Sequence, residues 1–184
     1  RKFKKVSISD KGKNYNSFDL KYGAINVLAI DEYINEKSID FIITDPPYGG
    51  LVQYLDLSYI WNVWLKHYDK SFSNIEFDSE ITINKKFDLT NYETKMTSAL
   101  KKLNTILKDD GKMVITFHNQ KIEIWNSFIR SLQNSNFIIE KVIHQKNRRS
   151  GESVVANPYG TSGTDFYIRC AKNLKMVSIN GSDK

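Results

Sequence analysis

The sequence predicts a single α/β domain with a mostly parallel sheet. Short β-rich apolar segments alternate along the chain with stretches whose apolar residues recur at helical spacing. The segment Ile39–Thr44 is mostly apolar and ends at two prolines, as expected for a strand that is covered on both faces. A chain of 184 residues is long enough to bury one hydrophobic core. Its composition, with 40% hydrophobic and 12% aromatic residues, is that of a folded domain.

Three parts are expected along the chain. Residues 1–16 are basic and polar and are interpreted as an N-terminal arm. Residues 17–172 carry the alternating pattern and form the domain, and residues 173–184 are a polar tail. No internal repeat or low-complexity linker divides the domain.

The first elements follow from local composition. Phe18–Gly23 suits a short strand, and Ile25–Tyr33 fits a helical segment or a turn. Ile39–Thr44 is the next strand and must end before Pro46, because proline cannot donate to the ladder. Tyr54–Leu65 has apolar residues at helical spacing, and its two tryptophans are expected to lie in the core.

The remaining elements continue the alternation. Residues 67–89 show no clear period and are expected to cross the surface. Thr90–Glu93 fits a capping box, which predicts a helix that begins there and ends at Asp109–Gly111. Met113–Phe117 is the next strand, and a helix follows near Lys121–Gln133 with Ile122 inward. Two further strands are expected at 137–143 and 165–171.

Charge and cysteine content narrow the class of protein. The net charge of +6 suits a polyanionic partner, although a solvated lysine-rich surface explains it equally well. The single cysteine, Cys170, excludes an internal disulfide, and the three scattered histidines have no metal-ligand spacing, so no metal is expected. Without a secretory signal or a membrane-length apolar run, a cytoplasmic protein with no membrane partner is expected.

Asp45-Pro46-Pro47-Tyr48 is the segment that most suggests chemistry, since ligands bind at the carboxyl edge of open α/β sheets. The Asp45 carboxylate and the Pro46 carbonyl are two acceptors that can hold the two hydrogens of a ring amino group. The prolines fix the backbone and bring no competing N–H, and Tyr48 offers a face on which an unstacked base can lie. The alternative is an ordinary turn, because Asp-Pro and Pro-Pro are common turn formers.

Thr44-Asp45-Pro46-Pro47-Tyr48-Gly49 resembles the catalytic motif of DNA amino-methyltransferases, which act on adenine N6 or cytosine N4. The Asp form is more typical of the adenine enzymes. Gln53–Ser58 and Trp61–Leu65 are similar to segments of bacterial adenine-specific DNA methylases, and Leu103–Phe117 and Asp165–Arg169 resemble later elements of the family. The resemblance implies a Rossmann-like, S-adenosylmethionine-dependent methyltransferase sheet.

The same resemblance implies S-adenosylmethionine as the cofactor, with Asp45 and Pro46 among the residues that bind it. Family members hold the cofactor on a glycine-rich loop, of which the sequence has no good copy. Gly23 and Ala24 fall where many relatives have a glycine and an acid that contacts the cofactor adenine, and here the acid is absent. The sheet is therefore expected to be incomplete and to hold the catalytic half, while a missing segment or subunit supplies the cofactor loop.

Other residues are expected to contact the substrate. Gly49 and Gly50 would let the backbone approach a base, and Tyr54 lies in the segment similar to the adenine-specific methylases. His118 and Asn119 follow a strand that should end at the same edge, although a helix cap explains Asn119 equally well. Basic loop residues can grip phosphates or read base edges, with a solvated loop as the alternative; these are Lys146, Arg148 and Arg149.

Together these observations predict methyl transfer from S-adenosylmethionine to N6 of a flipped adenine in DNA, in a setting such as restriction-modification. Two alternatives stay open. One is a tRNA or rRNA methyltransferase acting on guanine N2 or adenine. The other is a non-catalytic DNA-binding or recognition subunit with a vestigial pocket.

Overall fold

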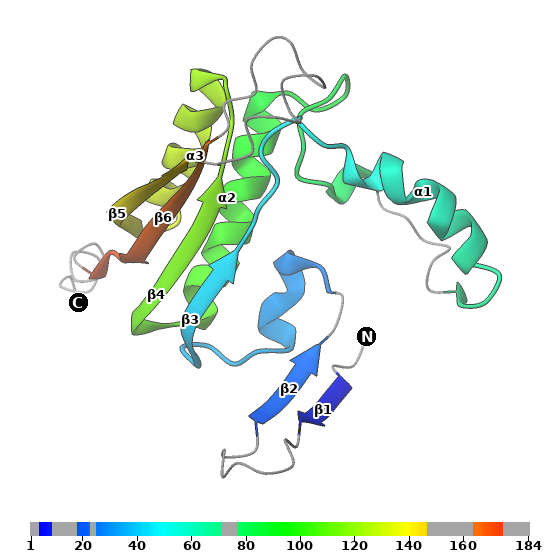
Figure 1. The fold of residues 1–184 in the computed structure, drawn as a ribbon, viewed down its shortest axis with the longest axis horizontal. Coiled ribbons are helices and arrows are strands. Elements are labelled where there is room, and N and C mark those ends of the chain that lie inside the picture. Colours follow the sequence, from blue (N-terminus) through cyan, green and yellow to red (C-terminus); the bar gives the residue numbers. More distant parts are fainter. Residues whose placement is uncertain (1–3, 9–17, 23–24, 71–76, 147–163, 175–184) are drawn as a thin grey trace, which may run out of the picture.

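A four-stranded open sheet forms the centre of the computed structural model, which describes residues 4–8, 18–22, 25–70, 77–146 and 164–174 (Figure 1). The strand order is β3-β4-β6-β5. The strands are β3 (Ile39–Thr44), β4 (Leu107–Phe117), β5 (Phe137–Lys146) and β6 (Thr164–Lys172). The predicted strands of the domain are therefore present, most of them longer than expected.

The pairing directions differ from the prediction of a mostly parallel sheet. β3 runs parallel to β4, whereas β6 is antiparallel to both β4 and β5. A parallel crossover needs a long connection, which helix α2 (Leu89–Ile106) provides between β3 and β4. In the part of the chain that the structure describes, no helix joins β5 to β6, and these two strands form an antiparallel pair.

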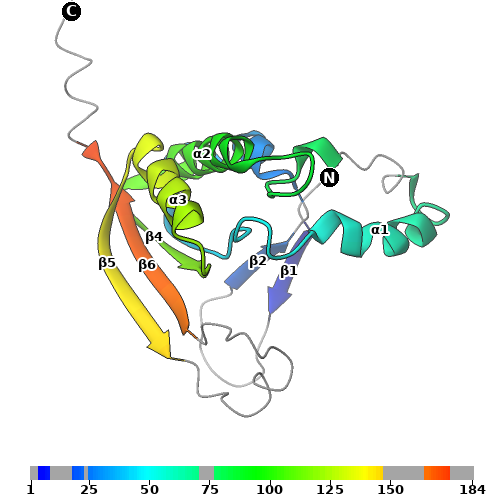
Figure 2. The same ribbon diagram turned by 90° about the horizontal axis from the view of Figure 1, so that it is seen from above.

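Helices α2 and α3 (Ile122–Asn134) cover the same face of the sheet (Figure 2). Alternate residues of β4 point toward them, and Met113, Ile115 and Phe117 are completely buried. The remaining buried residues of this core are Tyr92, Met96, Leu100, Leu107, Ile124, Phe128, Leu132, Phe137, Ile168 and Cys170. Ile122, which was expected to point inward, is instead exposed at the first turn of α3.

Both ends of α2 differ from the prediction. Asp88 is the N-cap, and its carboxylate accepts the Asn91 N–H at 2.8 Å, so the helix begins before the predicted capping box. The helix also ends at Ile106 rather than near residue 109, because Leu107 is already extended. The register shifts between Ile39–Leu107 and Phe41–Lys112, so the intervening residues of β4 form a bulge.

The N-terminal part contains two paired strands. β1 (Lys4–Ile8) and β2 (Phe18–Tyr22) form an antiparallel sheet of their own, and β1 lies within the segment interpreted as an arm. A 3-10 helix, η1 (Val27–Glu32), follows, and the Asn26 side chain caps it by accepting the Leu28 N–H at 3.0 Å. A helical segment or a turn was predicted over residues 25–33, and the 3-10 helix lies within that range. Gly23 and Ala24 lie outside the described residues.

Helix α1 (Tyr54–Leu65) is present as predicted, but it extends away from the sheet (Figure 1). Trp61 and Trp64 were expected in the core, yet their side chains are 59% and 57% exposed. The two rings contact each other edge to face at 5.6 Å. After α1 comes a short 3-10 helix, η3 (Phe77–Ser79). No helix among the described residues is long and apolar enough to cross a membrane.

The face of the sheet opposite α2 and α3 is partly uncovered. On β3, Phe41 and Ile43 point to this face, and Ile43 is 76% exposed. β3 is an edge strand of the described sheet, so the expectation that both of its faces are covered is wrong for the residues described. Apolar residues exposed on an open edge and an open face are typical of a surface that another element covers.

Candidate active site

The Asp45–Tyr48 motif lies where β3 ends, beside the end of β4. The parallel register pairs Thr44 with Ile115, so the next residues, Asp45 and Thr116, are level with each other. Asp45 is exposed, and Pro46 to Tyr48 are half-buried. The position at the carboxyl edge of a parallel strand pair is the one predicted, and it is where open sheets bind ligands.

Two hydroxyl groups hold one oxygen of the Asp45 carboxylate. The Thr116 hydroxyl donates to Oδ1 at 2.6 Å, and the Tyr48 hydroxyl donates to the same oxygen. The Thr116 and Tyr48 oxygens are 3.1 Å apart, which closes a triangle of polar atoms. Among the described residues, no group donates to Oδ2. One carboxylate oxygen is therefore held by two hydroxyl groups, whereas the other has no donor within the described ranges.

The backbone carbonyls after Pro46 are also held by the protein. The buried Tyr92 hydroxyl donates to the Pro47 carbonyl at 2.7 Å, and the Asn119 amide nitrogen donates to the Tyr48 carbonyl at 2.8 Å. In contrast, no described residue donates to the Pro46 carbonyl. Within the part of the chain that the structure describes, Asp45 Oδ2 and the Pro46 carbonyl thus receive no hydrogen bond; they are the two acceptors predicted to hold an amino group.

Burial keeps the Tyr48 hydroxyl protonated. Burial and the adjacent Asp45 carboxylate raise the pKa of Tyr48 to about 12, so at neutral pH this group is a hydrogen-bond donor. The edge of the ring packs against Phe117, with ring centroids 5.3 Å apart, and Phe117 stacks on Phe128 at 3.9 Å. The ring is therefore anchored in the core at one side. Stacking of Tyr48 on a base stays a prediction.

Gly49 and Gly50 permit a close approach within the protein itself. Gly49 is buried with φ of +74°, a conformation that favours glycine. A Cβ on Gly50 would lie 2.4 Å from the carbonyl oxygen of Ile83. Gln53 joins the same two segments, because its Nε2 donates to the Ile83 carbonyl at 3.1 Å and its Oε1 accepts from buried Thr82 at 3.2 Å.

This packing corrects the expectation that all of residues 67–89 cross the surface, since Thr82 is completely enclosed beneath the motif. It also gives the two glycines a structural reason to be present. Their contact with a substrate stays a prediction. Tyr54 is exposed at the start of α1, and His118 is half-buried directly after β4.

Asn119 holds the motif through a hydrogen bond to its backbone. Its side chain is 8% exposed, its amide nitrogen binds the Tyr48 carbonyl, and its Oδ1 accepts the Lys121 N–H at 2.8 Å. The Asn119 carbonyl accepts from the Trp125 ring at 3.0 Å. Both ends of the amide are thus engaged by the protein's own backbone, and contact of Asn119 with a substrate stays a prediction. The N-cap of α3 is Lys121, so the helix-cap alternative for Asn119 is not observed; its side chain instead closes a turn with Lys121.

Sequence reasoning missed two residues of the site, Thr116 and Tyr92. Nothing in the local sequence distinguishes a tyrosine whose hydroxyl reaches a motif carbonyl from one that only packs in the core, as Tyr92 also does. Thr116 had a detectable signal, because it is the last polar residue of a strand that ends level with the motif. The side chain of Lys146 and residues Arg148 and Arg149 lie outside the described residues.

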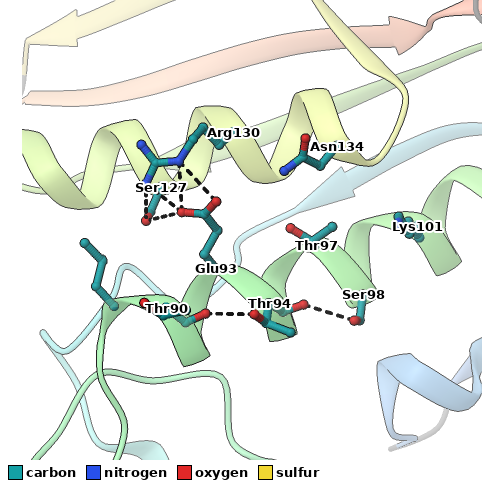
Figure 3. A pocket seen from close by; sticks show the side chains of 10 residues that line it. Thr90, Glu93, Thr94, Thr97, Ser98, Lys101, Ser127, Arg130 and Asn134 are labelled. Carbon is teal, nitrogen blue, oxygen red and sulfur yellow. Dashed lines mark hydrogen bonds and ion pairs between the residues drawn. The ribbon is translucent and has the colours of Figure 1, made fainter.

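A separate cavity of about 460 Å³ lies between α2 and α3, away from the motif (Figure 3). Within it, Arg130 forms an ion pair with Glu93 at 2.6 Å, and the Ser127 hydroxyl donates to the same carboxylate at 2.7 Å. The Arg130 guanidinium lowers the pKa of Glu93 below its ordinary value. These polar groups satisfy one another, so the cavity is explained as a surface groove between packed helices.

Metal chemistry finds no support in the described residues, where no group of three or more histidine, cysteine, aspartate or glutamate side chains is arranged to hold an ion. The arrangement at the motif is instead a pair of hydrogen-bond acceptors beside an aromatic ring. Such a pair can hold an exocyclic amino group and direct its nitrogen lone pair.

Two solved structures are among those similar to this chain. The PvuII DNA methyltransferase, which is cytosine-N4-specific, has a TM-score of 0.50 and 16% identity over 79% of this chain and 46% of its own. A DNA modification methylase candidate from Thermus thermophilus, solved with S-adenosyl-L-methionine, has a TM-score of 0.45 and 12% identity over 80% of this chain and 53% of its own. The chain thus spans about half the length of these structures.

No curated protein matches the sequence significantly. The likeness to the PvuII enzyme shows that the open mixed sheet is a Rossmann-like methyltransferase fold, as the motif resemblance implied. The N6/N4-type DNA methylase family model matches residues 39–175, which include the motif, the main sheet and both core helices. Because this match covers most of the chain, the protein belongs to that DNA methylase family.

Proposed function

We propose that this chain carries the base-binding half of an S-adenosylmethionine-dependent DNA methyltransferase that acts on adenine N6. The observation that carries the proposal is a pair of acceptors at the sheet edge, Asp45 Oδ2 and the Pro46 carbonyl, to which no described residue donates. The neighbouring Asp45 Oδ1 and the Pro47 and Tyr48 carbonyls are engaged by other residues. Membership of the DNA methylase family supports DNA as the substrate.

The acceptor pair suits the chemistry of an exocyclic amine. The nitrogen lone pair of such an amine is delocalised into the ring, which makes it a poor nucleophile. If its two hydrogens bond to Asp45 Oδ2 and the Pro46 carbonyl, the lone pair is directed out of the ring plane. Asp45 is also a base to which the nitrogen can release the proton that it must lose on alkylation. Holding the amine in this orientation lowers the entropic part of the barrier.

S-adenosylmethionine, when bound, supplies an electrophilic methyl group, and the sulfur departs with the electron pair of the broken C–S bond. Asp45 and Pro46 are the described residues that we propose to lie at the methyl end of the cofactor. Gly23 and Ala24 are proposed to lie nearer its adenine. The hydrogen bonds from Thr116 and Tyr48 hold the Asp45 carboxylate in place, and an acceptor held in this way keeps the amine in line with the methyl group.

The base is proposed to reach this edge by flipping out of the duplex and lying against Tyr48. Gly49, Gly50, Tyr54 and His118 are proposed to line its approach. The basic residues Lys146, Arg148 and Arg149 are proposed to contact the DNA backbone or base edges. The net charge of +6 supports a polyanionic partner.

Adenine is preferred over cytosine in this proposal because the motif begins with Asp45, and the Asp form is more typical of the adenine enzymes. The similar PvuII enzyme is cytosine-N4-specific, so N4-methylcytosine is the result that would contradict the preference. Label on RNA alone would favour the tRNA or rRNA alternative, and DNA binding without transfer would favour a recognition subunit.

We further propose that the cofactor loop comes from a segment or subunit that adds to the open edge of β3. Ile43 and Phe41 on that strand are exposed, and the chain spans about half the length of the solved methyltransferase structures. Residues 1–184 alone should therefore bind S-adenosylmethionine weakly or not at all in calorimetry. Tight binding by these residues would contradict this part of the proposal.

The central test is transfer from tritiated S-adenosylmethionine to DNA and to RNA by the full-length gene product, followed by chromatography of the nucleosides. Asp45→Asn should reduce transfer to DNA by roughly 10²–10³-fold, the range seen when one preorganised hydrogen bond is lost. Asp40→Asn is the matched control, because Asp40 lies on the same strand in an exposed pair with Lys108 and should retain activity. Wild-type activity in Asp45→Asn would refute the proposal.

A further inference from the structure

Thr116 connects the end of β4 to the motif through its side chain. It faces the same side of the sheet as Asp45, because the register pairs Ile43 with Val114 and Thr44 with Ile115. Its hydroxyl lies 2.6 Å from Asp45 Oδ1 and 3.1 Å from the Tyr48 oxygen. These partners are 71 and 68 residues away in the chain, so the contact is not a local turn interaction.

The number of hydroxyl protons determines which hydrogen bonds can form among Asp45, Tyr48 and Thr116. Threonine and protonated tyrosine have one hydroxyl proton each, and an ionised carboxylate can only accept. Both protons can therefore go to Asp45 Oδ1, as the contacts of Thr116 and Tyr48 with that oxygen indicate. Rotating the carboxylate would break both bonds at once. The two donors thus fix the orientation of the carboxylate and, with it, the direction in which its second oxygen points.

We infer that Thr116 is a positioning residue, which fixes the Asp45 carboxylate so that Oδ2 is presented to the target amine. This inference rests on the proposed function. Threonine suits the task because its β-branched side chain is stiff about χ1 and favours strands, so the hydroxyl is held in place by the backbone. A threonine present only for strand propensity would not need its hydroxyl, and valine would serve equally well.

The test compares substitutions that keep or remove this hydroxyl in the full-length gene product. Thr116→Val keeps the shape and removes the donor, whereas Thr116→Ser keeps the donor. Thr105→Val is the matched control, since the Thr105 hydroxyl bonds only to the Lys101 carbonyl of its own helix. Transfer of tritiated methyl to DNA gives kcat and KM for each variant.

Thr116→Val should lower kcat by roughly 10- to 100-fold, the range for a lost hydrogen bond to a charged group, and leave the KM values for DNA and cofactor nearly unchanged. Thr116→Ser should restore most of the rate, and Thr105→Val should behave as wild type. In an Asp45→Asn background, Thr116→Val should cause little further loss, because the acceptor oxygen that Thr116 would position is already replaced by an NH2 group.

The outcomes separate this inference from the proposed function. Wild-type kcat in Thr116→Val, with Asp45→Asn inactive, would overturn the positioning role and leave the function standing. Wild-type activity in Asp45→Asn would overturn the function itself. If Thr116→Val does not fold, as judged by circular dichroism, the serine variant decides, because a rate as low as that of Asp45→Asn with the hydroxyl present would contradict the inference.

Discussion

Replacing Gly50 with alanine tests the packing that supports the motif. A Cβ on Gly50 would lie 2.4 Å from the Ile83 carbonyl oxygen and 3.3 Å from its carbonyl carbon. A carbon–oxygen contact of roughly 3.3 Å is the close end of what proteins tolerate, so the two segments would have to separate by about 0.9 Å. The obstacle is backbone, which cannot rotate aside as a side chain could.

The size of the effect follows from the contacts that would be disturbed. Overpacking of a well-packed site costs about 1–3 kcal/mol. Separation would also break the bond from Gln53 Nε2 to the Ile83 carbonyl, now 3.1 Å, which contributes about 1 kcal/mol. Gly50→Ala should therefore lower the free energy of unfolding by about 2–4 kcal/mol and the Tm by about 5–15 °C.

Urea unfolding followed by circular dichroism measures this loss directly. Leu51→Ala is the control at the neighbouring position, where the side chain is largely exposed and the change should stay within about 0.5 kcal/mol. An unfolding midpoint for Gly50→Ala equal to that of the wild type would show that residues 50 and 83 are not in contact, and the argument for a structural role of this glycine would fail.

Three further results are expected. Tyr92→Phe removes the donor to the Pro47 carbonyl and should cost about 1–2 kcal/mol in urea unfolding, with a fall in kcat; an unchanged midpoint would contradict it. Arg130→Gln should lower the urea midpoint most at neutral pH. Because Arg130 lowers the pKa of Glu93, the ion pair stabilises the fold at pH values above the ordinary pKa of a glutamate, and this stabilisation is lost as the pH falls through the lowered pKa. A destabilisation that persists in acid would count against this prediction. Cys170, buried with its pKa raised to about 12, should react with a thiol reagent only after unfolding, and rapid labelling of the native protein at neutral pH would disprove this.

Local patterns were sufficient for the positions of most elements. β3, α1 and α3 begin and end within a few residues of their predicted bounds, because strand propensity, helical spacing and proline breaks are all properties of short segments. The same patterns could not tell where α1 lies. Trp61 and Trp64 have the spacing of a core stripe, but spacing shows only that one face is apolar and does not show what covers it.

Features that depend on partners distant in sequence were the ones missed. The bulge at the start of β4 and the antiparallel placement of β6 are set by pairing between strands, which the sequence of each strand does not reveal. The N-cap was placed two residues late because Asp88 and Thr90 both have side chains that can cap a helix. Only the geometry of the chain decides between them.

In the candidate site, too, the contiguous segment could be predicted from sequence and the contacts between distant residues could not. Asp45 to Tyr48 could be predicted because the motif is a contiguous segment with its own chemistry. Thr116 comes from 71 residues further along and Tyr92 from 45 residues beyond Pro47, so their contacts with the motif exist only in the folded chain. The hypothesis that two motif acceptors stay open could be stated from sequence, but the groups that engage the other acceptors could not.

The long separation between Asp45 and Thr116 has a consequence during synthesis. At about 5–20 residues per second, the ribosome needs roughly 4–14 s to add the 71 residues between them. Until β4 emerges and docks beside β3, a nascent chain has the motif but not the hydroxyl that orders its carboxylate. The Asp45 carboxylate is therefore ordered only after β4 has docked, while the core still lacks Phe137, Ile168 and Cys170 from the later strands β5 and β6.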